Sequence, residues 1–208
     1  IYFNAGQVCS AMSRLIVHED LYDEVGERAA ALARSLTVGP GMDMPEFGNN
    51  MGAMISEQQR DRAETLCREA ETQGARALAG ARKLNRHGWF LEPTVFTDVT
   101  PEMSIARTEV FGPVLSILRY RTEAEAIAIA NGTDYGLVAG VFTRDMDYAM
   151  RAARELRAGQ VFVNECYAGG VETPFGGYGK SGYGREKGRE ALWNYLQTKN
   201  IAIAVKPV

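Results

Sequence analysis

Cys9 lies in the segment Phe-Asn-Ala-Gly-Gln-Val-Cys-Ser, which contains residue types suited to holding a reactive thiol. Only the thiolate form of cysteine is an effective nucleophile, and backbone N–H groups close to the sulfur favour that form. Gly6 would let the backbone bend closely around the sulfur, while Asn4 and Gln7 could form a polar turn. The chemistry expected of this segment is attack by sulfur on an electrophilic carbon.

Two later stretches could shape a site around this thiol. Residues 109–114 read Glu-Val-Phe-Gly-Pro-Val and bring together a carboxylate, which can accept two hydrogen bonds, and an aromatic ring. Residues 174–184 read Pro-Phe-Gly-Gly-Tyr-Gly-Lys-Ser-Gly-Tyr-Gly, in which the glycines permit tight backbone turns. Without further context, the first stretch could equally hold a solvated acid and a core aromatic, and the second could be an ordinary loop.

The elements that must position these residues alternate between strands and helices. Short β-prone runs predict strands over residues 14–18, 75–79, 94–99, 114–120, 137–143 and 160–164. Apolar residues at three- and four-residue steps predict helices over residues 20–36, 56–74, 123–131, 146–156 and 185–196. Ser56 can cap the second helix, and Asn131-Gly132, which tolerate positive φ, can end the third.

This alternation predicts an α/β fold with a largely parallel sheet and helices on both of its faces, because parallel neighbours require helical crossovers. Residues 42–53, rich in Met, Gly and Asn, are expected to form a loop. The apolar residues 200–205 would be a hazard as an uncovered edge strand. We therefore expect a catalytic thiol domain over residues 1–195, and a tail over 196–208 that supplies a strand to another subunit.

Composition favours small-molecule chemistry in a reducing compartment. The 208 residues are 46% hydrophobic and 24% charged, as in one sizeable globular domain. The formal charge of −3 is spread along the chain, and no apolar run suits a membrane span, so neither nucleic acid nor a membrane is an expected partner. The three cysteines are widely spaced, which indicates neither a disulfide framework nor a zinc site, and no other spacing typical of metal ligands occurs. We therefore expect the protein in a reducing compartment, the cytoplasm.

The pattern Phe-x-Asn-x-Gly-Gln-x-Cys resembles the active-site signature of the aldehyde dehydrogenase superfamily. Further matches follow in the order of the family, and the resemblance extends over essentially the whole chain, with betaine-aldehyde and semialdehyde types the most similar in character. The matching segments are Glu-Val-Phe-Gly-Pro-Val from Glu109, then Asn164, Pro-Phe-Gly-Gly from Pro174, and Ser-Gly-Tyr-Gly-Arg-Glu from Ser181.

The resemblance implies oxidation of a small aldehyde to a carboxylic acid with NAD or NADP. The Cys9 thiolate would attack the aldehyde to form a thiohemiacetal, which loses hydride to the nicotinamide and becomes a thioester that water hydrolyses. The backbone N–H of Cys9 would stabilise the oxyanion together with an upstream Asn that this sequence does not contain.

Other site residues follow from the same resemblance. Glu109 matches the residue that binds the nicotinamide ribose, and Phe111 matches the aromatic beside the nicotinamide ring. Gln59 and Arg62 align loosely with positions near the adenosine ribose, and Glu186 matches an acid near the proton exit path. The expected substrate pocket consists of Phe3, Val8, Ser10, Tyr167 and Phe175.

The resemblance also implies that essential parts precede the chain. The family's glycine-rich dinucleotide-binding domain and its general-base Glu come before the thiol, whereas this sequence begins with Ile-Tyr-Phe-Asn shortly before Cys9. We expect the isolated chain to be inactive and the longer enzyme to be a homo-oligomer, either a dimer or a tetramer.

Alternative functions are compatible with parts of the sequence. An acylating semialdehyde dehydrogenase would share the thioester but transfer the acyl group to coenzyme A or phosphate. A cysteine hydrolase would need His18 or His87 to activate the thiol. A truncated, non-catalytic module could act only through its oligomerisation strand.

Overall fold

The centre of the molecule is a four-stranded sheet. A computed structural model describes residues 1–44, 50–167 and 169–205 of the chain. The sheet has the order β1 (Arg14–His18), β6 (Val114–Tyr120), β5 (Thr94–Val99) and β4 (Arg76–Ala79). β1, β6 and β5 are parallel, while β4 runs antiparallel to β5 at the edge.

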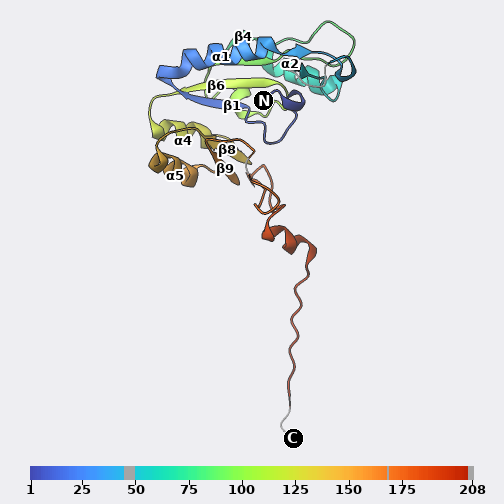
Figure 1. Cartoon of the computed structure of the whole chain (residues 1–208), viewed down its shortest axis with the longest axis vertical. Coiled ribbons are helices and arrows are strands. Elements are labelled where there is room, and N and C mark those ends of the chain that lie inside the picture. The colour runs from blue at the N-terminus through green and yellow to red at the C-terminus, as the bar shows by residue number, and fades with distance from the viewer. Residues whose placement is uncertain (45–49, 168, 206–208) are drawn as a thin grey trace.

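Helices cover the two faces of this sheet, as Figure 1 shows for α1 (Tyr22–Ser35) and α2 (Glu57–Thr72). Consecutive residues of β6 point to opposite faces, as the pleat of a strand requires. Ile117 is buried in the cluster that contains the α1 side chains, and Leu118 is buried in the cluster that contains the α2 side chains. The predicted α/β fold with a two-sided, largely parallel sheet is therefore confirmed.

A second unit follows in the chain and forms a separate layer beneath the sheet in Figure 1. It consists of α4 (Glu123–Asn131), β8 (Val138–Val141), α5 (Met146–Glu155) and β9 (Gln160–Val163). β8 and β9 pair in parallel with each other and form their own two-stranded sheet. The short elements are η1 (Phe3–Gly6), η2 (Glu19–Leu21), β2 (Thr37–Val38), η3 (Gly41–Asp43), β3 (Asn50–Met51), α3 (Ser104–Arg107), β7 (Tyr135–Gly136), β10 (Tyr178–Gly179) and η4 (Arg189–Tyr195).

Helix ends show which local expectations hold. The hydroxyl of Ser56 accepts a hydrogen bond from the Gln59 N–H at 3.2 Å, so the predicted cap of α2 is confirmed. α4 ends at Asn131 and Gly132 follows it, as predicted, although Gly132 has a φ of −77° and does not use its tolerance of positive φ. The Gly132 N–H instead donates to the carbonyl of Ile129 at 3.2 Å, which closes the helix without a left-handed residue.

The carboxy-terminal segment departs from one prediction and leaves another untested. The helix expected over residues 185–196 is only the 3₁₀ helix η4, and the apolar residues 200–205 form no strand in the described part of the chain. Ile203 is 80% exposed, and Figure 1 shows the tail extending away from the body. A strand needs a neighbour for its backbone hydrogen bonds, and a single chain offers none here. Pairing with another subunit stays a prediction.

Two further expectations reach beyond the described residues. Residues 45–49 of the predicted loop and residues 206–208 of the predicted tail lie outside them. Within the described ranges, every helix is too short or too polar to cross a bilayer.

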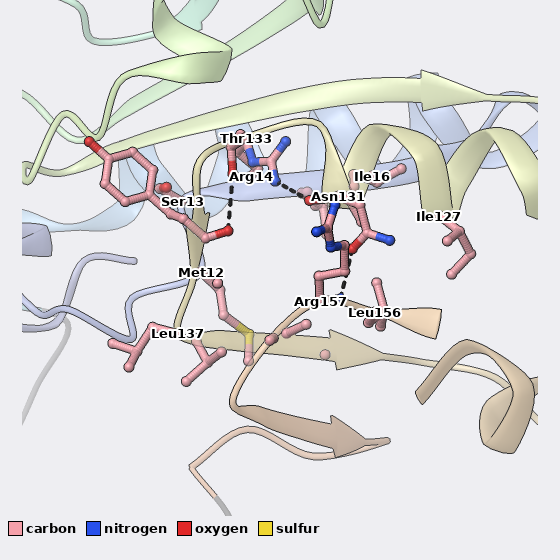
Figure 2. Close-up of a pocket in the computed structure, with 18 of the residues that line it drawn as sticks. Met12, Ser13, Arg14, Ile16, Ile127, Asn131, Thr133, Leu137, Leu156 and Arg157 are labelled. Atoms are coloured by element: carbon pink, nitrogen blue, oxygen red, sulfur yellow. Dashed lines mark hydrogen bonds between the residues drawn. The ribbon is translucent and has the colours of Figure 1, made fainter. Parts of the chain in front are cut away.

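Arg14 joins the first unit to the second. It lies at the start of β1, and its guanidinium donates to the carbonyls of Ile129 and Ala130 at 2.9 and 2.7 Å. These carbonyls belong to the last turn of α4, where a cation is favoured by the helix dipole and unpaired carbonyls need donors. Burial lowers the pKa of Arg14 from its usual value. Figure 2 shows Arg14 beside Asn131 at this end of α4.

Replacing Arg14 by Met should therefore destabilise the fold, since the carbonyls of Ile129 and Ala130 would lose the hydrogen bonds from the guanidinium while the aliphatic volume is largely kept. The expected loss is about 1 to 3 kcal/mol in the free energy of unfolding, measured by chemical denaturation. Arg28→Met is the matched control, because Arg28 makes an exposed ion pair with Glu24 within α1. The control should change stability by less than about 0.5 kcal/mol. Equal losses in the two variants would contradict the role given to Arg14.

Candidate active site

The segment before Cys9 is a tight left-handed turn. Asn4, Ala5 and Gly6 have φ values of 50°, 52° and 72°. Side-chain amides hold the turn from both ends: Asn4 Nδ2 donates to the Gln7 carbonyl at 3.1 Å, and Gln7 Nε2 donates to the Asn4 carbonyl at 3.2 Å. The polar turn considered for Asn4 and Gln7 is thus present. Two non-glycine residues are held in a sparsely populated conformation by these bonds.

Two further contacts attach this turn to the body of the fold. The Tyr2 hydroxyl donates to the carbonyl of Thr94 in β5 at 3.1 Å, and burial raises the pKa of Tyr2. The Gln7 side-chain oxygen accepts from the Ile55 N–H at 2.9 Å, just before α2. Cys9 is exposed at the end of this anchored segment. The thiol therefore extends from a fixed base into accessible space.

Of the three cysteines, Cys9 and Cys166 are accessible and Cys67 is not. Cys67 lies within α2, and burial raises the pKa of its thiol to about 12. At neutral pH Cys67 is thus an uncharged core residue. Cys166 lies near Met12, with 3.6 Å between the two sulfur atoms.

Gly6 packs directly against the loop that carries Glu109 and Phe111. A Cβ atom built on Gly6 would overlap the carbonyl group of Gly112 and lie 2.9 Å from the nitrogen of Pro113. Backbone can approach backbone this closely only where no side chain intervenes. The two motifs, far apart in the sequence, are therefore in direct contact through Gly6 and Gly112.

Gln59 and Arg62 hold the same loop from α2. Gln59 Nε2 donates to the carbonyls of Val110 and Phe111 at 3.0 and 2.9 Å. The Arg62 guanidinium donates to the carbonyls of Val110 and Glu109, both at 3.0 Å. Gln59 and Arg62, which were predicted to contact the cofactor, therefore bind the backbone of the loop that carries Glu109 and Phe111. Phe111 has a φ of 52°, and its side chain is 38% exposed.

Cys9 and Glu109 line one cavity of about 490 Å³. It lies between β1 on one side and α4, β8 and α5 on the other, and it also contacts Thr108 and Lys180. In Figure 2, Ser13 and Arg14 mark the side of β1, whereas Leu137 and Leu156 mark the opposite side. The cavity has the size of a small-molecule site, and Cys9 and Glu109 both contribute to its wall.

The segment carrying Phe175 and Glu186 closes on itself. The backbones of these two residues exchange both hydrogen bonds, each 2.7 Å long. Arg185 Nη1 donates to the carbonyls of Gly177 and Gly184 at 3.1 and 2.6 Å. A Cβ atom on Gly159 would overlap the Gly176 carbonyl, so the glycines here allow close backbone packing against the end of the second unit.

The structure brings together some predicted site residues and leaves others apart. Within the described residues, Cys9 and Glu109 line the cavity, and Gln59 and Arg62 contact the loop of Phe111. Phe111, Gln59 and Arg62 do not line the cavity themselves. The other predicted residues that do not line it are Phe3, Val8, Ser10, Tyr167, Phe175 and Glu186.

Sequence reasoning missed several residues of the cavity wall. Met12 and Ser13 could have been found, because they directly follow the thiol segment. Lys180 and Ser181 lie in the glycine-rich stretch 174–184 noted in the sequence, but that pattern did not show which of its side chains reach the wall. Lys180 Nζ pairs with Asp134 Oδ2 at 2.7 Å, and this hydrogen bond lowers the pKa of Asp134.

His18 offers no support for a Cys–His pair. It lies at the end of β1 away from the thiol segment, where its Nδ1 atom accepts from the Asp20 N–H at 3.3 Å. Its ring packs edge-on against Tyr120, with 5.3 Å between the ring centroids. These contacts account for His18 as a structural residue.

Comparison with known proteins gives a consistent result. Residues 1–201 match the profile described as the aldehyde dehydrogenase family. The chain is 41% identical over its whole length to a mitochondrial aldehyde dehydrogenase of Leishmania tarentolae, and 43% identical over 99% of its length to a mitochondrial benzaldehyde dehydrogenase of Antirrhinum majus. It spans 41% of the first relative and 38% of the second.

Solved structures agree with the sequence comparison. An NAD⁺ complex of an aldehyde dehydrogenase from Bacillus cereus superposes with a TM-score of 0.92 at 38% identity, over 99% of this chain and 41% of that one. Betaine aldehyde dehydrogenase from Staphylococcus aureus, in complex with NAD⁺, superposes with a TM-score of 0.89 at 37% identity, over 95% of this chain and 40% of that one. The backbone fold described above is therefore found in experimental structures.

Substituting Gly6 by Ala should disturb the contact between the two motifs. The added methyl group would meet the Gly112 carbonyl, and a φ of 72° is unfavourable for alanine. We expect a loss of about 1 to 3 kcal/mol in the free energy of unfolding, measured by denaturation. Gly52→Ala is the control, because nothing lies within 4 Å of a Cβ at that position. A Gly6→Ala protein as stable as the control would show that the close approach is absent.

Proposed function

This chain belongs to the aldehyde dehydrogenase family, and on that premise we propose that Cys9 is the nucleophile of an NAD(P)-dependent oxidation of an aldehyde to a carboxylic acid. The observation that carries the proposal is the cavity lined by both Cys9 and Glu109. The chain covers about two fifths of the length of its relatives, so the proposed activity is that of a longer enzyme.

Cys9 carries the covalent chemistry in this proposal. Its sulfur bonds to the aldehyde carbon, and the backbone N–H of Cys9 donates to the oxygen that becomes negatively charged. When the thiohemiacetal collapses, the carbon loses a hydride and the thioester forms. Water then cleaves the carbon–sulfur bond, which releases the acid and regenerates the thiol. Bound NAD(P)⁺ supplies the hydride acceptor.

Glu109 and Phe111 fit the binding of the nicotinamide half of the cofactor. Glu109 is exposed and lines the same cavity as Cys9, and a carboxylate can accept hydrogen bonds from ribose hydroxyls. Phe111 presents a partly exposed ring on the same loop. The two solved relatives described above were crystallised with NAD⁺, which supports a cofactor of this class.

The proposal includes roles for residues outside the cavity. We assign Glu186 to the proton exit path, and we assign the selection of the aldehyde to the segments on either side of the thiol and to two later loops. The residues concerned are Phe3, Val8, Ser10, Tyr167 and Phe175.

The described cysteines are all free, which supports a reducing compartment such as the cytoplasm.

Activity should depend on Cys9 and on the whole protein. In the whole protein, Cys9→Ala should lower kcat for NAD(P)-dependent aldehyde oxidation by about a thousandfold or more, since no other group can form the thioester. Cys166→Ser, at the other exposed cysteine, should keep kcat within about threefold. NADH formation measured by absorbance reports both. A kcat of Cys9→Ala close to that of the wild type would refute Cys9 as the nucleophile. The 208-residue chain alone should show no turnover, and turnover by that chain would contradict the expected need for the rest of the protein.

The apolar tail should mediate association between subunits. Ile201 and Ile203 are 73% and 80% exposed and would lie on one face of an extended strand. Replacing both by Asp in the whole protein should convert a homo-oligomer into a smaller species, as measured by light scattering after size-exclusion chromatography. Tyr183→Asp, at another fully exposed position, should leave the mass unchanged. An oligomer that survives the double substitution would rule out this interface.

A further inference from the structure

Two side chains of α2 donate four hydrogen bonds to three successive backbone carbonyls. The Gln59 side chain donates to the carbonyls of Val110 and Phe111, and the Arg62 side chain donates to those of Val110 and Glu109. The four donor–acceptor distances are between 2.9 and 3.0 Å. The Val110 carbonyl accepts from both residues. A side-chain amide and a guanidinium are thus directed at one short stretch of backbone.

This stretch needs such support because its conformation is unfavourable. Phe111 has a φ of 52°, a region that non-glycine residues rarely adopt. Such conformations persist only where the surroundings determine them, and they gather at functional sites. The Val110 side chain is 3% exposed and fixes one point of the loop in the core. The hydrogen bonds from Gln59 and Arg62 fix the carbonyls around it.

The same end of α2 also contacts the thiol segment. The Ile55 N–H donates to the Gln7 side chain at 2.9 Å, and Ser56 caps the helix through the N–H of Gln59. Gly6 in turn packs on Gly112, which closes the set of contacts. The amino-terminal turns of α2 therefore fix both the segment that ends at Cys9 and the loop that begins at Glu109.

We propose that Gln59 and Arg62 are positioning residues, which hold the backbone of residues 109–111 and so set where the Glu109 carboxylate and the Phe111 ring lie relative to Cys9. The proposal rests on the proposed function, because it gives these two side chains their role in cofactor binding. It differs from the expectation of Gln59 and Arg62 as direct ligands of the adenosine ribose. Their donors are directed at the loop carbonyls.

The side-chain amide of Gln59 allows a test that distinguishes positioning of the loop from direct binding of the cofactor ribose. Gln59 acts as a donor to the carbonyls, so a carboxylate at this position would repel them. Ribose hydroxyls, in contrast, donate readily to a carboxylate, so a direct ligand would tolerate that change. Gln59→Glu thus has opposite expected effects under the two roles. Arg62→Lys keeps the charge and can serve one carbonyl, so it should be milder than Arg62→Ala.

Steady-state kinetics on the whole protein provide the first test. Gln59→Ala and Gln59→Glu should each raise KM for the cofactor by about tenfold, because hydrogen bonds that preorganise the loop are lost. Arg62→Ala should do the same, and Arg62→Lys should recover part of the loss. The matched control is Gln58→Ala, an exposed glutamine beside Gln59 in the same helix, and it should keep the wild-type KM. Wild-type KM in Gln59→Glu would overturn the proposal.

Hydrogen exchange provides a second test that does not require turnover. In the whole protein without cofactor, backbone amides of residues 109–112 should exchange about tenfold faster in Gln59→Ala than in Gln58→Ala. Unchanged exchange would refute the positioning role even if the enzyme is active. If exchange is faster in Gln59→Ala while the unsubstituted protein does not oxidise aldehydes, the proposed function is refuted and the positioning of residues 109–111 by Gln59 still holds.

Discussion

The close approach of Gly6 to the carbonyl of Gly112 is the contact on which the site depends. The contact joins the segment that ends at Cys9 to the loop that begins at Glu109. These two segments lie far apart in the sequence, and only backbone atoms meet between them. A side chain on Gly6 would occupy the position of the neighbouring carbonyl, so the contact exists only because Gly6 is glycine. Cys9 and Glu109, which belong to the two segments joined in this way, both line one cavity.

The rest of the fold supplies the rigid frame around this contact. The parallel core of the sheet fixes where β1 and β6 begin, and each of these strands directly follows one of the two segments. α2 covers one face and reaches both segments from its amino-terminal end. Arg14 then holds the last turn of α4, and with it the opposite wall of the cavity, against β1. The sheet and the second unit therefore form opposite walls of the cavity, and α2 fixes the two segments that carry Cys9 and Glu109.

Local sequence signals predicted much of this frame, and nonlocal pairing accounts for what they missed. The bounds of β1, β5, β6 and α4 agree with the predicted ranges, because hydrophobic runs, capping residues and turn residues act within a few positions. The antiparallel direction of β4, the separate β8–β9 sheet and the unpaired tail depend on partners distant in the chain. Likewise, motif residues indicated Cys9 and Glu109, whereas the bonds from Gln59 and Arg62 to loop carbonyls follow only from tertiary structure.

The covalent state of the three cysteines during turnover tests the central claim most directly. Whole protein quenched with acid in the presence of an aldehyde and NAD(P)⁺, then digested and analysed by mass spectrometry, should carry the acyl group on the peptide that contains Cys9. The adduct should require the oxidised cofactor, because the thioester forms only after hydride loss. An acyl group on the peptide of Cys67 or Cys166, or turnover with no acylated cysteine under any quenching time, would contradict the account.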